Sequence, residues 1–135
     1  MTKIVVERRF GVPYGPRQII DHVLFLTVTR NAGAAFGLFQ NFTLGFLLIS
    51  GVVMAGILIY YWRLPPNDWS GRIGLSLVFG GAVANAYDRG VKGSVIDFIQ
   101  VPHWPIFNVA DSAITVGVAI LVLGTIWRSR RPRRA

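Results

Sequence analysis

Long apolar segments separated by short polar ones are the main pattern along this chain. Phe42–Trp62 and Phe107–Trp127 are almost uninterrupted apolar runs, and about 20 such residues are needed for a helix to cross the hydrocarbon core of a membrane. Ile73–Tyr87 is shorter and rich in glycine and alanine, a composition typical of a membrane helix packed closely against its neighbours. The pattern predicts an all-α membrane protein with three transmembrane helices, over residues 42–62, 73–89 and 107–127.

The segment before the first apolar run has a different pattern. Val23–Thr29 is β-branched and aromatic with partial alternation, which favours a short strand. Gly11, Pro13, Gly15 and Pro16 indicate a turn before it. We therefore predict that residues 1–41 form an extracytoplasmic strand region, with a small β-sheet on the outer membrane face, and that residues 90–106 form a loop on the same side.

The distribution of charge gives this arrangement its orientation. The net charge is +8, and five of the fourteen basic residues lie between Arg128 and Ala135, directly after the last apolar run. Juxtamembrane arginines mark the cytoplasmic side of a span, so we interpret residues 128–135 as a cytoplasmic tail rather than as a nucleic-acid-binding segment. The chain has no cysteine, which excludes a thiolate nucleophile and a cysteine-ligated metal.

Three of the six acidic residues lie in or beside the apolar segments, where ionisable groups are costly and mark candidate functional sites. The predicted topology brings Asp97 and Asp111 to the same membrane face. Two neighbouring carboxylates can share a proton and act as acid and base on a peptide bond and a water molecule. Each aspartate also has a simpler interpretation: Asp97 as a solvated turn acid, and Asp111 as an acid in the first turn of a helix capped by Asn108.

Two further clusters could line such a site. Asn85, Asp88 and Arg89 have helical spacing that places them on one face, where they could bind a polar ligand or form a salt-bridged helix end. Asn31 lies in RNAGAAFG, at residues 30–37, where small residues allow close backbone approach. A simple turn into the helix explains that motif equally well.

Taken in order, NAGAAFG, GGAVANAYDRG, GSVIDF and FNVADSAITVG resemble the signature motifs of the lipoprotein signal peptidase (signal peptidase II) family, over about residues 2–127. The resemblance implies an aspartic endopeptidase of the bacterial inner membrane that cuts diacylglyceryl-modified prolipoproteins just before the lipidated cysteine. It implies a monomer among membrane lipids, without metal or other cofactor. It also implies that Asp97 and Asp111 are the catalytic pair, and it gives supporting or substrate-contacting positions to Asn31, Gly33, Gly81, Asn85, Asp88, Arg89, Asn108 and Ala110.

The chain departs from the family pattern in two places. Ala84 stands where glycine is usual before the asparagine of GGAxGN, and the family has a further membrane helix that ends in D-Q-x-S/T-K, of which Thr2 and Lys3 match the end. The resemblance therefore implies four transmembrane helices in the full family and three here. Two alternative functions remain open at this point: an inactive lipoprotein-binding relative, and a small proton-linked transport subunit.

Overall fold

The computed structural model describes residues 2–33 and 42–130. Residues 34–37 of the RNAGAAFG motif and residues 131–135 of the predicted basic tail lie outside the described residues. Helices and strands follow in the order α1 (Thr2–Phe10), β1 (Tyr14–Ile20), β2 (Leu24–Asn31), α2 (Thr43–Arg63), α3 (Trp69–Lys92), β3 (Val95–Gln100) and α4 (Val109–Ser129).

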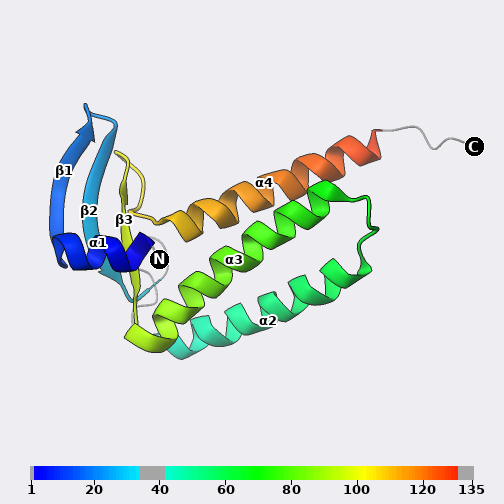
Figure 1. The fold of residues 1–135 in the computed structure, drawn as a ribbon, viewed down its shortest axis with the longest axis horizontal. Helices are drawn as coiled ribbons and strands as arrows, with labels where there is room; N and C mark the ends of the chain where they lie inside the picture. Colours follow the sequence, from blue (N-terminus) through cyan, green and yellow to red (C-terminus); the bar gives the residue numbers. More distant parts are fainter. Residues whose placement is uncertain (1, 34–41, 131–135) are drawn as a thin grey trace, which may run out of the picture.

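Three long helices form one half of the molecule, with α3 between α2 and α4 (Figure 1). Within the described residues, α2 and α4 are long and apolar enough to cross a membrane, and their bounds lie within two residues of the predicted ones. The third helix, α3, is longer than predicted because Asp68 caps its start by accepting a hydrogen bond from Gly71 N and Gly93 ends it in the left-handed conformation. Its crossing of the membrane stays a prediction, since its ends carry several charged residues.

Small residues bring α3 and α4 into close contact. A Cβ atom added at Gly117 would lie 2.7 Å from the carbonyl oxygen of Gly74, and one added at Gly81 would lie 2.5 Å from the carbonyl oxygen of Ala110. Both distances are too short for any side chain to fit without movement of the backbone. The glycines therefore allow the two helix backbones to approach each other, a packing mode that is also common between membrane helices.

The three strands form an antiparallel sheet in the order β1-β2-β3. The sheet lies at one end of the helices, and its strands run across their long axes (Figure 1). Val28, Ile96 and Phe98 form a small buried core, against which Val6 and Phe10 of α1 pack. The sheet and the strand over Val23–Thr29 are thus confirmed, whereas the location of the sheet on the outer face stays a prediction.

The first twenty residues differ from the prediction. The expected turn over Gly11–Pro16 is wrong in its second half, because β1 begins at Tyr14 and includes Gly15 and Pro16. Since β1 is an edge strand, it tolerates a proline that cannot donate to a neighbouring strand. A helix, α1, precedes it in a region expected to contain only strands, and it is stabilised by its packing on the sheet core rather than by a strong pattern of its own. The segment 90–106 contains β3 as well as loops.

Candidate active site

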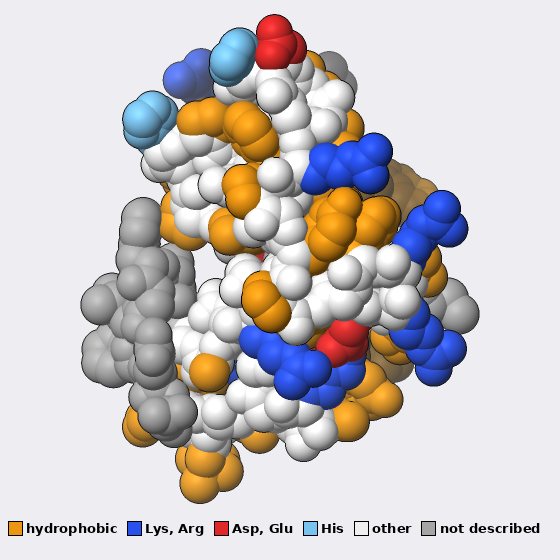
Figure 2. Space-filling view, turned by 90° about the vertical axis from the view of Figure 1, so that its left-hand side faces the viewer, with side chains coloured by type: hydrophobic (Ala, Val, Ile, Leu, Met, Phe, Trp, Pro, Cys, Tyr) orange, Lys and Arg blue, Asp and Glu red, His pale blue; other side chains and the backbone are white. Residues whose placement is uncertain are grey.

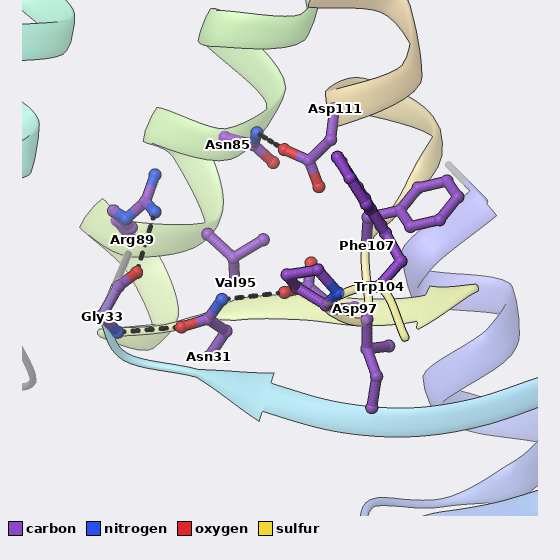
Figure 3. Close-up of a pocket in the computed structure, with 11 residues that line it drawn as sticks. Asn31, Gly33, Asn85, Arg89, Val95, Asp97, Trp104, Phe107 and Asp111 are labelled. Carbon is purple, nitrogen blue, oxygen red and sulfur yellow. Dashed lines mark hydrogen bonds between the residues drawn. The ribbon is translucent and has the colours of Figure 1, made fainter. Parts of the chain in front are cut away.

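A cavity of about 280 Å³ lies where the end of α3, the start of α4 and strand β3 meet. Figure 3 shows polar side chains from these elements and from the end of β2 around this space. Six of the ten residues singled out from the sequence line it. The cavity-lining residues are Asn31, Gly33, Asn85, Arg89, Val95, Asp97, Trp104, Pro105, Ile106, Phe107 and Asp111.

Asp97 lies in the middle of β3 and is only 3 % exposed. Its carboxylate accepts hydrogen bonds from Asn108 Nδ2 to Oδ1 at 2.7 Å and from Asn31 Nδ2 to Oδ2 at 3.0 Å. Burial raises the pKa of Asp97 above its ordinary value, and the negative charge of Asp111 adds to the rise, while the two amide hydrogen bonds oppose it. This carboxyl group therefore retains a proton to higher pH than a solvated aspartate.

Asp111 lies in the first turn of α4, inside a reciprocal capping arrangement. Its Oδ2 accepts a hydrogen bond from the backbone N–H of Asn108 at 3.0 Å, while the side chain of Asn108 accepts from the backbone N–H groups of Ala110 and Asp111. Its Oδ1 accepts from Asn85 Nδ2 at 2.8 Å. The simple interpretation of Asn108 as a helix cap is thus confirmed, and the same cap holds Asp111 at the cavity.

Asn108 connects the two aspartates. Its side-chain N–H donates to Asp97, its backbone N–H donates to Asp111, and the residue is fully buried. A buried amide with both partners satisfied holds them in a defined geometry. The two carboxylates therefore face the same cavity and are fixed relative to each other through one residue.

Behind this pair lies a residue that was not among the predicted site residues. Lys3 is 7 % exposed, and its Nζ donates to Asn85 Oδ1 at 2.7 Å and lies 2.9 Å from Asp88 Oδ2. A buried ammonium needs such partners because an unpaired charge in the interior is costly. Asp88 consequently neutralises Lys3 and does not line the cavity, whereas Asn85 carries the hydrogen-bond network from Lys3 to Asp111. The match of Thr2 and Lys3 to the end of a family motif was the sequence signal for this position.

Arg89 lies at the opposite edge of the cavity from α4 (Figure 3). Its guanidinium lies 4.8 Å from the centre of the Phe46 ring, and Nη2 donates to the carbonyl oxygen of Gly33 at 3.3 Å. Its buried Nε has no hydrogen-bond partner among the described residues. Arg89 thus has donor capacity left for a polar group in the cavity.

The remaining predicted positions support the cavity from outside. Gly81 and Ala110 form the close α3–α4 contact beneath it. The loop after β3 forms an apolar wall of Trp104, Pro105, Ile106 and Phe107, which sequence reasoning missed because aromatic and aliphatic residues near a membrane have many possible roles. The cavity therefore combines a polar side with two carboxylates and an apolar side suited to aliphatic groups.

This arrangement is suited to acid–base chemistry on a peptide bond. One carboxyl group with a raised pKa can hold a proton and act as an acid, and a second carboxyl group that can act as a base faces the same space. Amide and guanidinium donors around them can position a carbonyl group.

Comparison with known proteins identifies the family. The family model described as Signal peptidase (SPase) II matches residues 1–127. The chain is 45 % identical over 117 residues to the lipoprotein signal peptidase of Brevibacillus brevis, covering 85 % of this chain and 78 % of that protein, and 42 % identical over 137 residues to that of Geobacter metallireducens, covering 96 % and 84 %.

Solved structures agree with this assignment. A bacterial membrane enzyme determined by the in meso method at 2.3 Å resolution is 28 % identical and superposes with a TM-score of 0.87 over 99 % of this chain and 84 % of that one. A second bacterial membrane enzyme, at 1.9 Å, is 30 % identical with a TM-score of 0.79, over 92 % and 82 %. The resemblance of the four motifs is confirmed, and the chain belongs to the signal peptidase II family.

Proposed function

We propose that this protein is an aspartic endopeptidase of the bacterial cytoplasmic membrane that removes signal peptides from diacylglyceryl-modified prolipoproteins, cutting just before the lipidated cysteine. The family supports prolipoprotein processing. The observation that carries the aspartic mechanism is the double contact of Asn108, which donates to Asp97 and Asp111 at the same cavity.

In this mechanism Asp97 holds the proton and acts as the acid, because its pKa is raised by burial, and Asp111 acts as the base. Asp111 takes a proton from a water molecule as the water oxygen attacks the carbonyl carbon of the scissile bond, while Asp97 donates its proton to the carbonyl oxygen. The tetrahedral intermediate then collapses: the proton on Asp111 passes to the amine nitrogen, the C–N bond breaks, and the hydroxyl proton returns to Asp97. The pair is back in its starting state, and no cofactor takes part.

The surrounding residues have separate roles in this proposal. Arg89 and Asn31 contact the peptide backbone of the substrate, and the apolar wall formed by residues 104–107 contacts aliphatic groups next to the cleavage site. With α2, α3 and α4 crossing the bilayer, the cavity lies at the extracytoplasmic interface, where a substrate whose lipid stays in the bilayer can reach it. The acids at one end of the helices argue against a proton-linked transport subunit, which would need them near the middle.

The test is cleavage of a diacylglyceryl prolipoprotein by purified protein in proteoliposomes, followed by mass spectrometry of the released signal peptide. Asp97→Asn and Asp111→Asn should each lower the rate by about 10²–10⁴-fold, the usual contribution of a general acid or base. Asp21→Asn changes an exposed acid in the β1–β2 turn and should leave the rate unchanged. Normal processing by either active-site variant would reject the mechanism, and substrate binding without cleavage by the unmodified protein would identify an inactive relative.

A further inference from the structure

Helix α2 contacts the candidate active site from outside the cavity. Within the described residues it contributes no side chain to the cavity lining, yet its first turn is fixed to the end of α3 that carries Arg89. Thr43 Oγ1 donates a hydrogen bond to the carbonyl oxygen of Gly93 at 3.2 Å. Three residues further along α2, the ring of Phe46 faces the guanidinium of Arg89, with 4.8 Å between the Cζ atom and the ring centre. The start of α2 therefore supports the cavity residue Arg89.

The Phe46 ring is itself held in place. It is half-buried and makes an edge-type contact with Phe42, one helical turn earlier, with the ring centres 5.9 Å apart and the ring planes at 79°. The next residue, Leu47, lies against the last turn of α3, because a Cβ atom added at Gly90 would be 3.9 Å from its side chain. A ring has two faces, and an edge-to-face contact engages at most one of them. Phe46 therefore keeps a face for the guanidinium.

An aromatic face holds Arg89 where a carboxylate would be the usual partner. None of the ion pairs among the described residues includes Arg89. Its neighbour Asp88 is paired with Lys3, and Glu7 is shared by two other cations; basic side chains gather around an acidic one on this end of the molecule (Figure 2). A carboxylate would take up N–H groups of the guanidinium, whereas a ring attracts the cation through its π-electrons. The ring therefore fixes the guanidinium and leaves its N–H groups available.

The position of Arg89 also affects one whole side of the cavity. Its Nη2 donates to the carbonyl oxygen of Gly33 at 3.3 Å, and the backbone N–H of Gly33 donates to Asn31 Oδ1 at 3.0 Å. Because Oδ1 of Asn31 is occupied in this way, the amide turns its NH₂ group toward Asp97, to which it donates at 3.0 Å. Figure 3 shows this series of hydrogen bonds along the cavity. A ring that holds the guanidinium therefore also steadies the contacts that lead to Asp97.

We propose that Phe46 is a positioning residue for substrate binding: its ring holds the Arg89 guanidinium at the cavity edge, so that the free N–H groups meet a carbonyl oxygen of the substrate peptide. The buried Nε of Arg89, which has no hydrogen-bond partner among the described residues, is one such group. The proposal rests on the proposed function, in which Arg89 contacts the substrate backbone. Because that contact is made in the bound substrate as well as in the transition state, its loss raises KM and leaves kcat nearly unchanged.

The first test compares steady-state cleavage of a diacylglyceryl prolipoprotein by variants in proteoliposomes. Phe46→Leu keeps an apolar side chain but removes the ring face, and it should raise KM about 3–30-fold, the range expected for a cation–π contact, with kcat within about twofold. Phe46→Tyr keeps the face and should restore KM. Phe79→Leu makes the same change at another half-buried phenylalanine, in a groove between α2 and α3 away from the cavity, and should leave both constants unchanged.

The second test measures binding without turnover, as the Kd of a fluorescently labelled diacylglyceryl prolipoprotein for the Asp111→Asn variant. Adding Phe46→Leu should raise this Kd by the same factor, and in an Arg89→Gln background it should have no further effect, because the ring then has no cation to hold. Phe46→Met replaces Phe46→Leu if the latter does not fold.

Three outcomes would overturn the proposal. An unchanged Kd in Phe46→Leu means that the ring does not support binding. An equal loss in Phe79→Leu means that the effect comes from general packing of α2 and α3. A full effect of Phe46→Leu in the Arg89→Gln background means that the ring does not act through Arg89. Absence of cleavage by the unmodified protein, together with binding that depends on Phe46, would overturn only the proposed hydrolysis.

Discussion

The contact between α3 and α4 changes character along its length. In its middle, Gly74 and Gly117 bring the two backbones together without polar groups. At its end, Asn85 and Asn108 form hydrogen bonds that connect both helices to Asp111 and to strand β3. Gly81 and Ala110 lie at the boundary between these two regions.

The difference shows how an apolar contact positions a polar site. Asparagine and aspartate have short side chains, so hydrogen bonds of 2.7–3.0 Å between them require backbones that are already close. Gly74 and Gly117 set that separation between the two helix backbones without any polar side chain. At the polar end, this short separation lets the asparagine and aspartate side chains form hydrogen bonds. The geometry of these side chains is well defined because their amide groups have partners.

The largest effect is expected at the polar end. Asn108→Leu removes the donor to Asp97 and the cap of α4 together, so we expect cleavage to fall by about 100-fold or more and the free energy of unfolding to fall by about 1–3 kcal/mol from the donors and acceptors left unpaired. Asn67→Leu, in the α2–α3 loop, is the matched control. Cleavage assays and thermal unfolding in nanodiscs measure the two effects, and full activity of the Asn108→Leu variant would contradict the role of Asn108 in fixing the pair.

The next largest effect is a difference in stability between alanine substitutions at two adjacent glycines. Gly81→Ala places a methyl group against the Ala110 carbonyl oxygen, and the overpacking should cost about 1–3 kcal/mol of stability and disturb the cavity above it. Gly80→Ala adds the same atom where nothing lies within 4 Å and should be neutral or slightly stabilising. The melting temperatures of both variants test this, and equal destabilisation would show that the close approach of the helices is unimportant.

A smaller effect concerns the pH profile of the polar end. Asn31 donates to the ionised form of Asp97 and so lowers a pKa that burial raises. Removing this bond in Asn31→Val should raise the pKa of Asp97 further. Since the mechanism needs a proton on Asp97, the alkaline limb of kcat/KM should move to higher pH. Thr29→Val changes a side chain opposite Asp97 on β2 and should leave the limb in place. A shift to lower pH in Asn31→Val would contradict the assigned roles.

The smallest effect is expected outside both regions, at the ion pairs of Glu7 with Lys92 and Arg30, which connect α1 to α3 and β2. Hydrogen bonding to Lys92 is the main reason that the pKa of Glu7 lies below its ordinary value of 4.5. The stabilisation is therefore present above pH 4.5 and is lost as the pH falls through the lowered pKa. Glu7→Gln should lower the free energy of unfolding by less than about 1 kcal/mol at neutral pH and should leave it unchanged in acid. Thermal unfolding of both proteins as a function of pH measures the difference.

Sequence reasoning located the parts of the molecule whose pattern is local. The apolar lengths of α2 and α4, the strand before Asn31 and the cap at Asn108 could all be predicted from neighbouring residues. Lys3 matched the end of a family motif, but its contacts with Asn85 and Asp88 could not be predicted, because these partners lie more than 80 residues away and only the fold brings them together. Likewise β1 forms despite Gly15 and Pro16 because β2 offers it a partner, and neighbouring strands can override a weak local preference.

Because Asn108 both caps α4 and donates to the two carboxylates, winding of the first helical turn and pairing of Asp97 with Asp111 are coupled. Fraying of that turn, a low-cost motion at helix ends, would separate Asp111 from Asp97 without unfolding the protein. In the proposed mechanism, the active fraction of molecules is then the fraction in which this one turn is wound.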